Sequence, residues 1–265
     1  MMMKRFQLRH IFLALITLVM PAMASCTNHV IADIEAEPKA AIIDQLNSVK
    51  SNVLYTETTR EILEAHGYAV DVWQGKDITV SFYRDLPAQG YKLIIFRTHL
   101  GILSLVSESE VIPMNTTCLF TNEVYTTGKY VLDQFSERLQ EGQMSEDYPT
   151  VFTLTPKFIT DSMNGEFDDT AILMMGCASS YRDDMAAAFV EKGASAYLGW
   201  NATVTLDYLD DTVLTLVDNL FAKQMNIEQA VASTMDEAGY DPYYNARLRY
   251  YPQSAVNQTI SILNN

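Results

Sequence analysis

Short apolar segments alternate with amphipathic stretches along most of the chain. Segments of this kind, bounded by turn residues, are typical of strands that are covered on both faces of a sheet. Alternation of strands with helices favours right-handed crossovers and a parallel sheet. The pattern therefore predicts an α/β fold with a doubly wound, mostly parallel sheet flanked by helices on both faces. The expected strands are Ala40–Leu46, Tyr68–Trp73, Tyr91–Arg97, Thr170–Gly176 and Ala194–Trp200.

The segments between these strands carry the periodicity and end signals of helices. The first helix is expected to begin after the N-cap Ser51 and to end at Gly67. Further helices are expected over residues 183–193, 209–220 and 227–234, each with an apolar stripe or complementary end charges. The stripe that the first helix is expected to turn inward consists of Leu54, Thr58, Ile62 and Ala65.

Residues 102–165 fit this alternation less well and are expected to form an insertion that flanks the sheet. Within it, residues 118–121 and 151–155 are predicted to be short strands, and Lys129–Gln140 is predicted to be a helix. The tyrosine-rich tail, residues 241–252, is expected to pack against the edge of the domain.

The N-terminus has the three regions of an export signal. Lys4, Arg5 and Arg9 precede ten apolar residues, too few for a membrane span of about 20, and the small-residue stretch Ala22–Ser25 follows. Two interpretations of the cleavage site stay open. One is an A-x-A site, and the other is the lipoprotein-like box "MASC", in which Cys26 is lipidated.

The predicted organisation is a signal peptide over residues 1–25, a polar tether over residues 26–38 and a single domain over residues 39–265. The expected location is extracytoplasmic, either secreted or held on the outer face of a membrane through a lipid on Cys26. The formal net charge is −15, and no cluster of Lys and Arg occurs beyond the first nine residues. Nucleic acid is therefore excluded as a partner, because nothing would neutralise its phosphates.

Two reactive side chains follow predicted strands. His99 comes two residues after the strand that ends at Arg97, and Cys177 directly follows the strand that begins at Thr170. Ligands of open α/β sheets bind beyond the carboxyl ends of the strands, so the two groups share one edge if their strands are neighbours. A nearby imidazole favours the thiolate over the thiol, whose free pKa is about 8.5. The alternatives are a small core cysteine and a structural loop histidine.

The order of residues limits the kind of catalyst. No histidine occurs after His99, which excludes papain-like enzymes and α/β-hydrolases, because both place the histidine after the nucleophile. His66 is expected to cap a helix C-terminus. The cysteines lack C-x-x-C spacing and the four histidines are scattered, so no metal site and no cofactor is predicted. In an exported chain, Cys118 and Cys177 are a possible disulfide pair.

A histidine and then a cysteine, each after a buried parallel strand, resemble the caspase-like superfamily of cysteine peptidases: caspases, metacaspases, legumains, gingipains and separases. The segment "LMMGCASS" looks like the separase-type "LMGCSS", and "AAAFVEKGASAYLGWNATVT" is similar to the segment that follows the cysteine in separases. The resemblance covers about residues 40–222. It implies a caspase-like fold and a peptide or protein substrate. Cys177 would attack the scissile carbonyl, His99 would position or protonate the leaving amine, and the amides of Gly101 and Cys177 would bind the oxyanion.

The chain departs from the family pattern at two positions. Leu100 separates His99 from Gly101, where the family commonly has His-Gly. Met175 stands where caspases, metacaspases and legumains carry a polar or acidic residue, which is closer to the separase and gingipain branches. These departures leave two hypotheses: an exported endopeptidase with a Cys/His dyad, and a non-catalytic extracytoplasmic binding or scaffold domain of the same fold. The oligomeric state is left open.

The resemblance also implies residues that bind the substrate. In separases an aspartate just after the "W.VT" segment recognises an arginine side chain. Asp207 is the nearest counterpart, with Asp210 and Asp211 as rivals, and Trp200 would form an apolar wall. Cleavage after basic residues is the specificity that this implies. Arg97 would instead recognise an acidic side chain, or else make a structural salt bridge.

Overall fold

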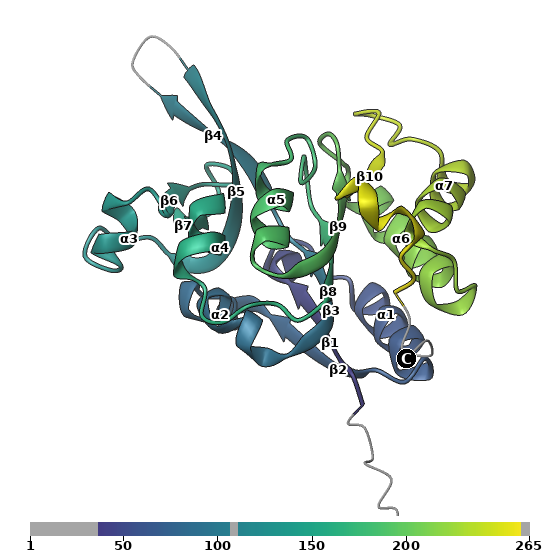
Figure 1. The fold of residues 1–265 in the computed structure, drawn as a ribbon. Coiled ribbons are helices and arrows are strands. Elements are labelled where there is room, and N and C mark those ends of the chain that lie inside the picture. Colours follow the sequence, from purple (N-terminus) through teal and green to yellow (C-terminus); the bar gives the residue numbers. More distant parts are fainter. Residues whose placement is uncertain (1–36, 107–110, 261–265) are drawn as a thin grey trace, which may run out of the picture. The chain divides into compact units, whose positions relative to one another are not determined.

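A six-stranded sheet in the order β10-β9-β8-β3-β1-β2 forms the centre of the fold (Figure 1). The computed structural model describes residues 37–106 and 111–260. Five strands run parallel, and β10 at one edge is antiparallel to β9. The predicted α/β class with a mostly parallel sheet is therefore confirmed. The strands are β1 (Lys39–Asp44), β2 (Ala69–Gln74), β3 (Tyr91–Arg97), β8 (Thr170–Met175), β9 (Ala194–Trp200) and β10 (Leu248–Tyr251).

Helices cover both faces of this sheet (Figure 1). Successive side chains of a strand point to opposite faces, so Ile95 of β3 packs in one core and Phe96 in the other. The first core is covered by α1 (Val53–Ala65), α6 (Leu206–Val217) and α7 (Ile227–Ala238). The second core is covered by α2 (Val80–Asp85), α4 (Pro156–Ser162) and α5 (Asp184–Glu191), together with a second sheet.

The first helix differs in register from the prediction. Its N-cap is Asn52, whose side chain accepts a hydrogen bond from the Tyr55 amide, rather than Ser51. The buried residues are Tyr55, Thr56, Thr59 and Leu63, whereas Leu54 is 74% exposed. This rotation buries the large Tyr55 ring, an arrangement that the sequence periodicity did not distinguish from a stripe one residue away.

The region predicted as an insertion forms a four-stranded antiparallel sheet in the order β4-β5-β7-β6. The predicted helix over Lys129–Gln140 is wrong for most of its length. Only α3 (Val131–Phe135) is helical, and its exposed apolar side chains leave it without a buried stripe. Strand pairing across the sheet, rather than local pattern, decides these elements. The strands are β4 (Leu100–Val106), β5 (Val111–Val124), β6 (Leu139–Gly142) and β7 (Val151–Leu154).

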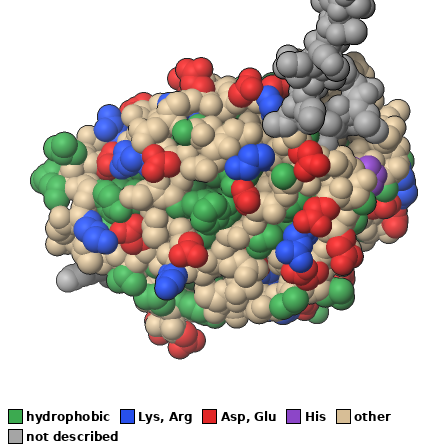
Figure 2. All heavy atoms as spheres, turned by 90° about the horizontal axis from the view of Figure 1, so that it is seen from below, with side chains coloured by type: hydrophobic (Ala, Val, Ile, Leu, Met, Phe, Trp, Pro, Cys, Tyr) green, Lys and Arg blue, Asp and Glu red, His purple; other side chains and the backbone are tan. Residues whose placement is uncertain are grey.

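The tyrosine-rich tail contributes the edge strand β10, which pairs with β9, so this segment does pack at the edge of the domain. The predicted signal peptide and Cys26, and the tether up to residue 36, lie outside the described residues. Within the described residues, none of the helices has the length and apolar character needed to cross a membrane. The face shown in Figure 2 mixes acidic with basic side chains and carries apolar side chains near its middle.

Candidate functional site

The strands that precede His99 and Cys177 are direct neighbours. β3 and β8 pair in parallel, with Arg97 opposite Met175 at the end of the ladder. The Thr98 amide continues this pairing by donating to the Met175 carbonyl at 3.1 Å. His99 and Cys177 therefore leave the same edge of the sheet from adjacent strands, which is the condition that the sequence argument required.

Gly176 brings the two chain segments into contact beyond the last pair. A Cβ atom built on Gly176 would lie 2.2 Å from the Thr98 carbonyl oxygen and 2.5 Å from Leu100 Cδ1. Only a residue without a side chain permits this approach. His99 directly follows Thr98, and Cys177 directly follows Gly176. Each reactive residue therefore has its Cα atom about 3.8 Å from that of a residue in this contact. The two reactive residues are thus linked through a close backbone contact.

His99 is held by its backbone and packed on its ring. Its amide donates to Gln45 Oε1 at 2.9 Å, and its carbonyl accepts from the Phe120 amide at 3.2 Å. The imidazole stands edge-on to the Phe120 ring, with 4.5 Å between ring centroids. Burial lowers the pKa of His99 from its ordinary value, because the charged form loses hydration. At neutral pH the imidazole is therefore uncharged and can accept a proton.

Cys177 is half-buried, and its thiol donates to the Val204 carbonyl, with 3.4 Å between sulfur and oxygen. Burial raises the pKa of Cys177, and the nearby charge of Asp241 raises it further. The expectation that His99 favours a thiolate is not met in this conformation, since both groups are in their neutral forms near pH 7. A reaction at this sulfur would begin with proton transfer from the thiol.

The loop after Cys177 is hydrogen-bonded to the end of β9 and the residues that follow it. The Ala178 amide donates to the Ala202 carbonyl at 2.9 Å, and Ala178 itself has a left-handed φ of 53°. Ser179 is fully buried, and its hydroxyl donates to the Met174 carbonyl and accepts from the Trp200 amide, each at 2.8 Å. These bonds fix the start of the loop, whereas α5 begins only at Asp184.

Gly101, one of the two predicted oxyanion donors, lies in β4 opposite Cys118 of β5. The Phe120 amide bonds the His99 carbonyl, and hydrogen-bonded pairs of an antiparallel ladder recur at every second residue. Gly101 and Cys118 occupy the next such position. The Gly101 amide is thus placed to bond within the ladder and would have to leave it to bind an oxyanion. The oxyanion role of the Cys177 amide stays a prediction.

The residues predicted to bind substrate differ in their exposure to solvent. Trp200 is fully buried in the core, with its ring 5.6 Å from that of Tyr208. Asp207 is exposed at the start of α6, where it pairs with Lys50. Its rival Asp211 is likewise exposed on α6. The predicted apolar wall is therefore buried in the core, whereas the carboxylates of Asp207 and Asp211, two of those predicted to bind a substrate arginine, face solvent.

Arg97 and Asp210 form a buried ion pair together with Asp44. The guanidinium donates to both Asp210 oxygens, at 2.7 and 3.0 Å, and to Asp44 at 2.9 Å. Although burial by itself would lower the pKa of Arg97, the hydrogen bonds and charges of the two carboxylates raise it above its usual value. Asp210 is therefore not available to bind a substrate arginine in this conformation. Arg97 makes a structural salt bridge, which was one of its two predicted roles.

Three residues near the site were missed by the sequence argument. Gln45, directly after β1, is buried and holds the His99 amide, and Phe120 packs on the imidazole. Asp241 is buried and accepts from both the amide and the hydroxyl of Thr205, as well as from two amides of the tyrosine-rich tail. The Asp-Pro pair at Asp241 is a recognisable turn signal. Gln45 and Phe120 carry no such signal.

Cys118 and Cys177 are both free thiols, so the possible disulfide between them is absent. Cys118 is buried in β5, and burial raises the pKa of its thiol to about 11. Over residues 37–106 and 111–260, no three His, Cys, Asp or Glu side chains gather in a way that could hold a metal ion.

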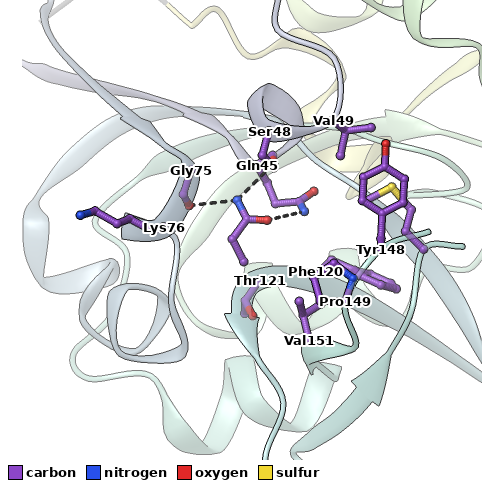
Figure 3. A pocket seen from close by; sticks show the side chains of 12 residues that line it. Gln45, Ser48, Val49, Gly75, Lys76, Phe120, Thr121, Tyr148, Pro149 and Val151 are labelled. Atoms are coloured by element: carbon purple, nitrogen blue, oxygen red, sulfur yellow. Dashed lines mark hydrogen bonds between the residues drawn. The ribbon is translucent and has the colours of Figure 1, made fainter. Parts of the chain in front are cut away.

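A pocket of about 330 Å³ adjoins the His99 side of the site. It lies between the turns that follow β1 and β2, the strand β5, and the segment that leads into β7. Gln45 and Phe120, the two residues that contact His99, both line it, whereas Cys177 does not (Figure 3).

No family model matches the chain, and no curated protein sequence matches it. Among solved structures, the chain is similar to the Arg-specific cysteine proteinase gingipain R, with 11% identity and a TM-score of 0.44. The match covers 84% of this chain and 44% of the gingipain chain, so this chain spans less than half the length of that protein.

Proposed function

We propose that the chain is an exported caspase-like cysteine endopeptidase that hydrolyses peptide bonds with Cys177 and His99. The observation that carries the proposal is the adjacency of β3 and β8, whose ends meet at the contact between Thr98 and Gly176. A thiol and a neutral imidazole leave this contact on neighbouring strands. Both are half-buried rather than sealed in the core.

The reaction follows from the neutral forms of both groups. The Cys177 sulfur forms a bond to the scissile carbonyl carbon, and the thiol proton passes to His99, whose lowered pKa leaves it free to accept. His99 then gives that proton to the leaving nitrogen as the C–N bond breaks. Water, with His99 accepting one of its protons, cleaves the resulting thioester, which releases the acid and restores the thiol. The Cys177 amide is the proposed donor to the oxyanion.

The test is cleavage of a mixture of internally quenched peptides. Cys177→Ala should abolish turnover, because no other residue supplies the nucleophile. Cys118→Ala, which removes the other described thiol from the core of the second sheet, is the matched control and should retain it. Undiminished turnover by Cys177→Ala would refute the assignment.

Preference for a basic residue before the scissile bond is the finer part of the proposal and rests on Asp207. This carboxylate is exposed and pairs with the surface residue Lys50, so it is open to exchange with a substrate cation. Asp207→Asn should lower kcat/KM for arginine peptides more than for alanine peptides. Asp211→Asn, an exposed neighbour on the same helix, is the control. Equal effects of the two substitutions on both peptides would remove Asp207 from the site.

Export and lipid attachment at Cys26 rest on the basic and apolar regions of the N-terminus. Expression of the full chain with a radiolabelled fatty acid tests both cleavage interpretations. Label that disappears with Cys26→Ser supports a lipoprotein, and an unlabelled protein that begins at residue 25 supports the A-x-A site. Retention of the whole N-terminal segment in the cytoplasm would contradict export.

A non-catalytic binding domain of the same fold is the second candidate. The observations that favour it are the thiol bonded to the Val204 carbonyl and the Gly101 amide placed to bond within its ladder. Wild-type protein that binds peptides without cleaving any of them would support this function over the first.

A further inference from the structure

The pocket beside His99 is formed by segments distant in sequence. The short helices η1 (Gln45–Ser48) and η2 (Gly75–Asp77) follow β1 and β2, and they face β5 and the segment between β6 and β7 (Figure 3). All of these lie beyond the carboxyl ends of the strands, where ligands of α/β sheets bind. The volume of about 330 Å³ is at the lower end of small-molecule sites, ~300–1,000 Å³, and suits one side chain rather than an extended ligand.

One side of this pocket is formed mainly by apolar and aromatic side chains. Phe120, Tyr148, Pro149 and Val49 gather on one side in Figure 3, while the Lys76 side chain extends away from them. Among the described residues that line it, none is acidic and Lys76 is the one with a charged side chain. An apolar occupant is therefore favoured over a basic one.

Two polar side chains of the pocket, those of Gln45 and Asn122, already have hydrogen-bond partners. The side-chain nitrogen Nδ2 of Asn122 donates to the backbone carbonyls of Gln45 and Gly75, at 3.2 and 2.9 Å. Its oxygen accepts from Gln45 Nε2 at 2.9 Å. An apolar side chain that covers these two amides would not leave them without partners, which is the usual cost of covering polar groups.

Of the two reactive residues, the pocket lies on the side of His99 rather than of Cys177. Gln45 and Phe120 contact His99, whereas Cys177 contacts the segment after β9 at Val204. In the proposed reaction the sulfur binds the acyl half of the substrate and the imidazole gives its proton to the amine half. The amine half therefore lies on the His99 side, next to the pocket.

We infer that this pocket binds a large apolar side chain of the substrate residue that follows the scissile bond, and that it rejects lysine and arginine there. The inference rests on the proposed endopeptidase function. Because Gln45 and Phe120 both line the pocket and hold His99, a side chain that fills it also steadies the imidazole. Occupation should thus improve kcat as well as binding.

Peptides that differ only in the residue after the scissile bond test the inference. Wild-type kcat/KM should be about tenfold or more higher with leucine than with alanine or lysine at that position. Val49→Trp, which places an indole in the pocket, should bring the leucine peptide down to the alanine peptide. Leu132→Trp adds an indole at an exposed position of α3 outside the lining, and it should keep the wild-type preference. A second variant covers the case in which Val49→Trp does not fold. Lys76 is exposed, and Lys76→Glu should raise kcat/KM for the lysine peptide relative to the leucine peptide.

A binding measurement separates failure of the pocket from failure of the enzyme. Titration of the Cys177→Ala protein with the same uncleaved peptides should give tighter binding for leucine than for lysine, lost in Val49→Trp. If wild type cleaves nothing but this binding pattern holds, the peptidase proposal fails and the pocket stands. Equal binding and equal cleavage of all peptides, or a leucine preference that both Val49→Trp and Lys76→Glu leave unchanged, would overturn the pocket assignment.

Discussion

The carbonyl oxygen of Thr98 occupies the position that a side chain at residue 176 would need. A Cβ built on Gly176 falls 2.2 Å from this oxygen, far inside any real contact. The glycine thus permits the ends of β3 and β8 to stay together for one residue beyond their last ladder pair. This contact sets where His99 and Cys177 leave the sheet.

Gly176→Ala should destabilise the fold and disturb the site together. The obstructing atom is backbone and cannot swing aside, so an overpacking cost of about 1–3 kcal/mol is expected. Gly128→Ala is the matched control, because no atom lies within 4 Å of the place that its methyl carbon would take and its φ is not left-handed. Urea denaturation of both variants measures the difference. Equal stabilities would show that the strand ends part without cost.

The two described thiols should differ in their reaction with iodoacetamide. Native protein should be labelled at the half-buried Cys177 and not at Cys118, which is 3% exposed with a pKa raised to about 11. Because burial also raises the pKa of Cys177, its labelling rate should climb through the alkaline range. Peptide mapping by mass spectrometry gives both rates. Rapid labelling of Cys177 at pH 6 would instead indicate a preformed thiolate.

His99 should make stability depend on pH in the acid range. Its pKa is lowered in the folded state, so the unfolded chain binds a proton first as pH falls below about 6.5. Stability is therefore fully present above that pH and is lost below it, by at most about 1.4 kcal/mol per pH unit. His99→Gln should remove this slope in urea denaturation between pH 7 and 5. A pH slope that persists unchanged in His99→Gln would contradict this prediction.

Arg97→Met should be strongly destabilising. It leaves Asp44 and Asp210 as buried carboxylates without their cation, and loss of one partner of a buried pair costs about 3–5 kcal/mol. Lys157→Met breaks an exposed pair with Glu137 and should change little. Denaturant midpoints of the two variants provide the comparison. A midpoint for Arg97→Met equal to that of the wild type would show that the buried pair is not needed for the fold.

The elements that local pattern predicted correctly are those that pack against the central sheet. β3 and β8 are short apolar runs, and β3 has the predicted ends Tyr91 and Arg97. In the second sheet, the predicted strands over residues 118–121 and 151–155 lie in β5 and β7, whereas β4 and β6 were missed because they depend on partners far along the chain. Gln140, expected at the end of a helix, lies in β6 opposite Thr153 for the same reason.

For the candidate site, the positions of His99 and Cys177 after two strands could be predicted, since the carboxyl ends of parallel strands share an edge. The environments of these side chains could not. Burial shifts both groups toward their neutral forms, and it depends on Phe120 and Val204, which come from other elements. The same holds for Asp210, whose pairing with Arg97 joins residues 113 positions apart.

The sequence by itself determined the class of fold and the places of its main strands along the chain, and it indicated the pair of residues that we propose to react. These follow from the short-range alternation of apolar and polar residues, which records burial on each face of a strand or helix. Only the tertiary structure decided which groups are neutral, which carboxylate is taken up by Arg97, and that Gln45 and Phe120 join His99 to a pocket. Such properties arise from contacts between segments that the chain brings together only when it folds, and local pattern carries no record of them.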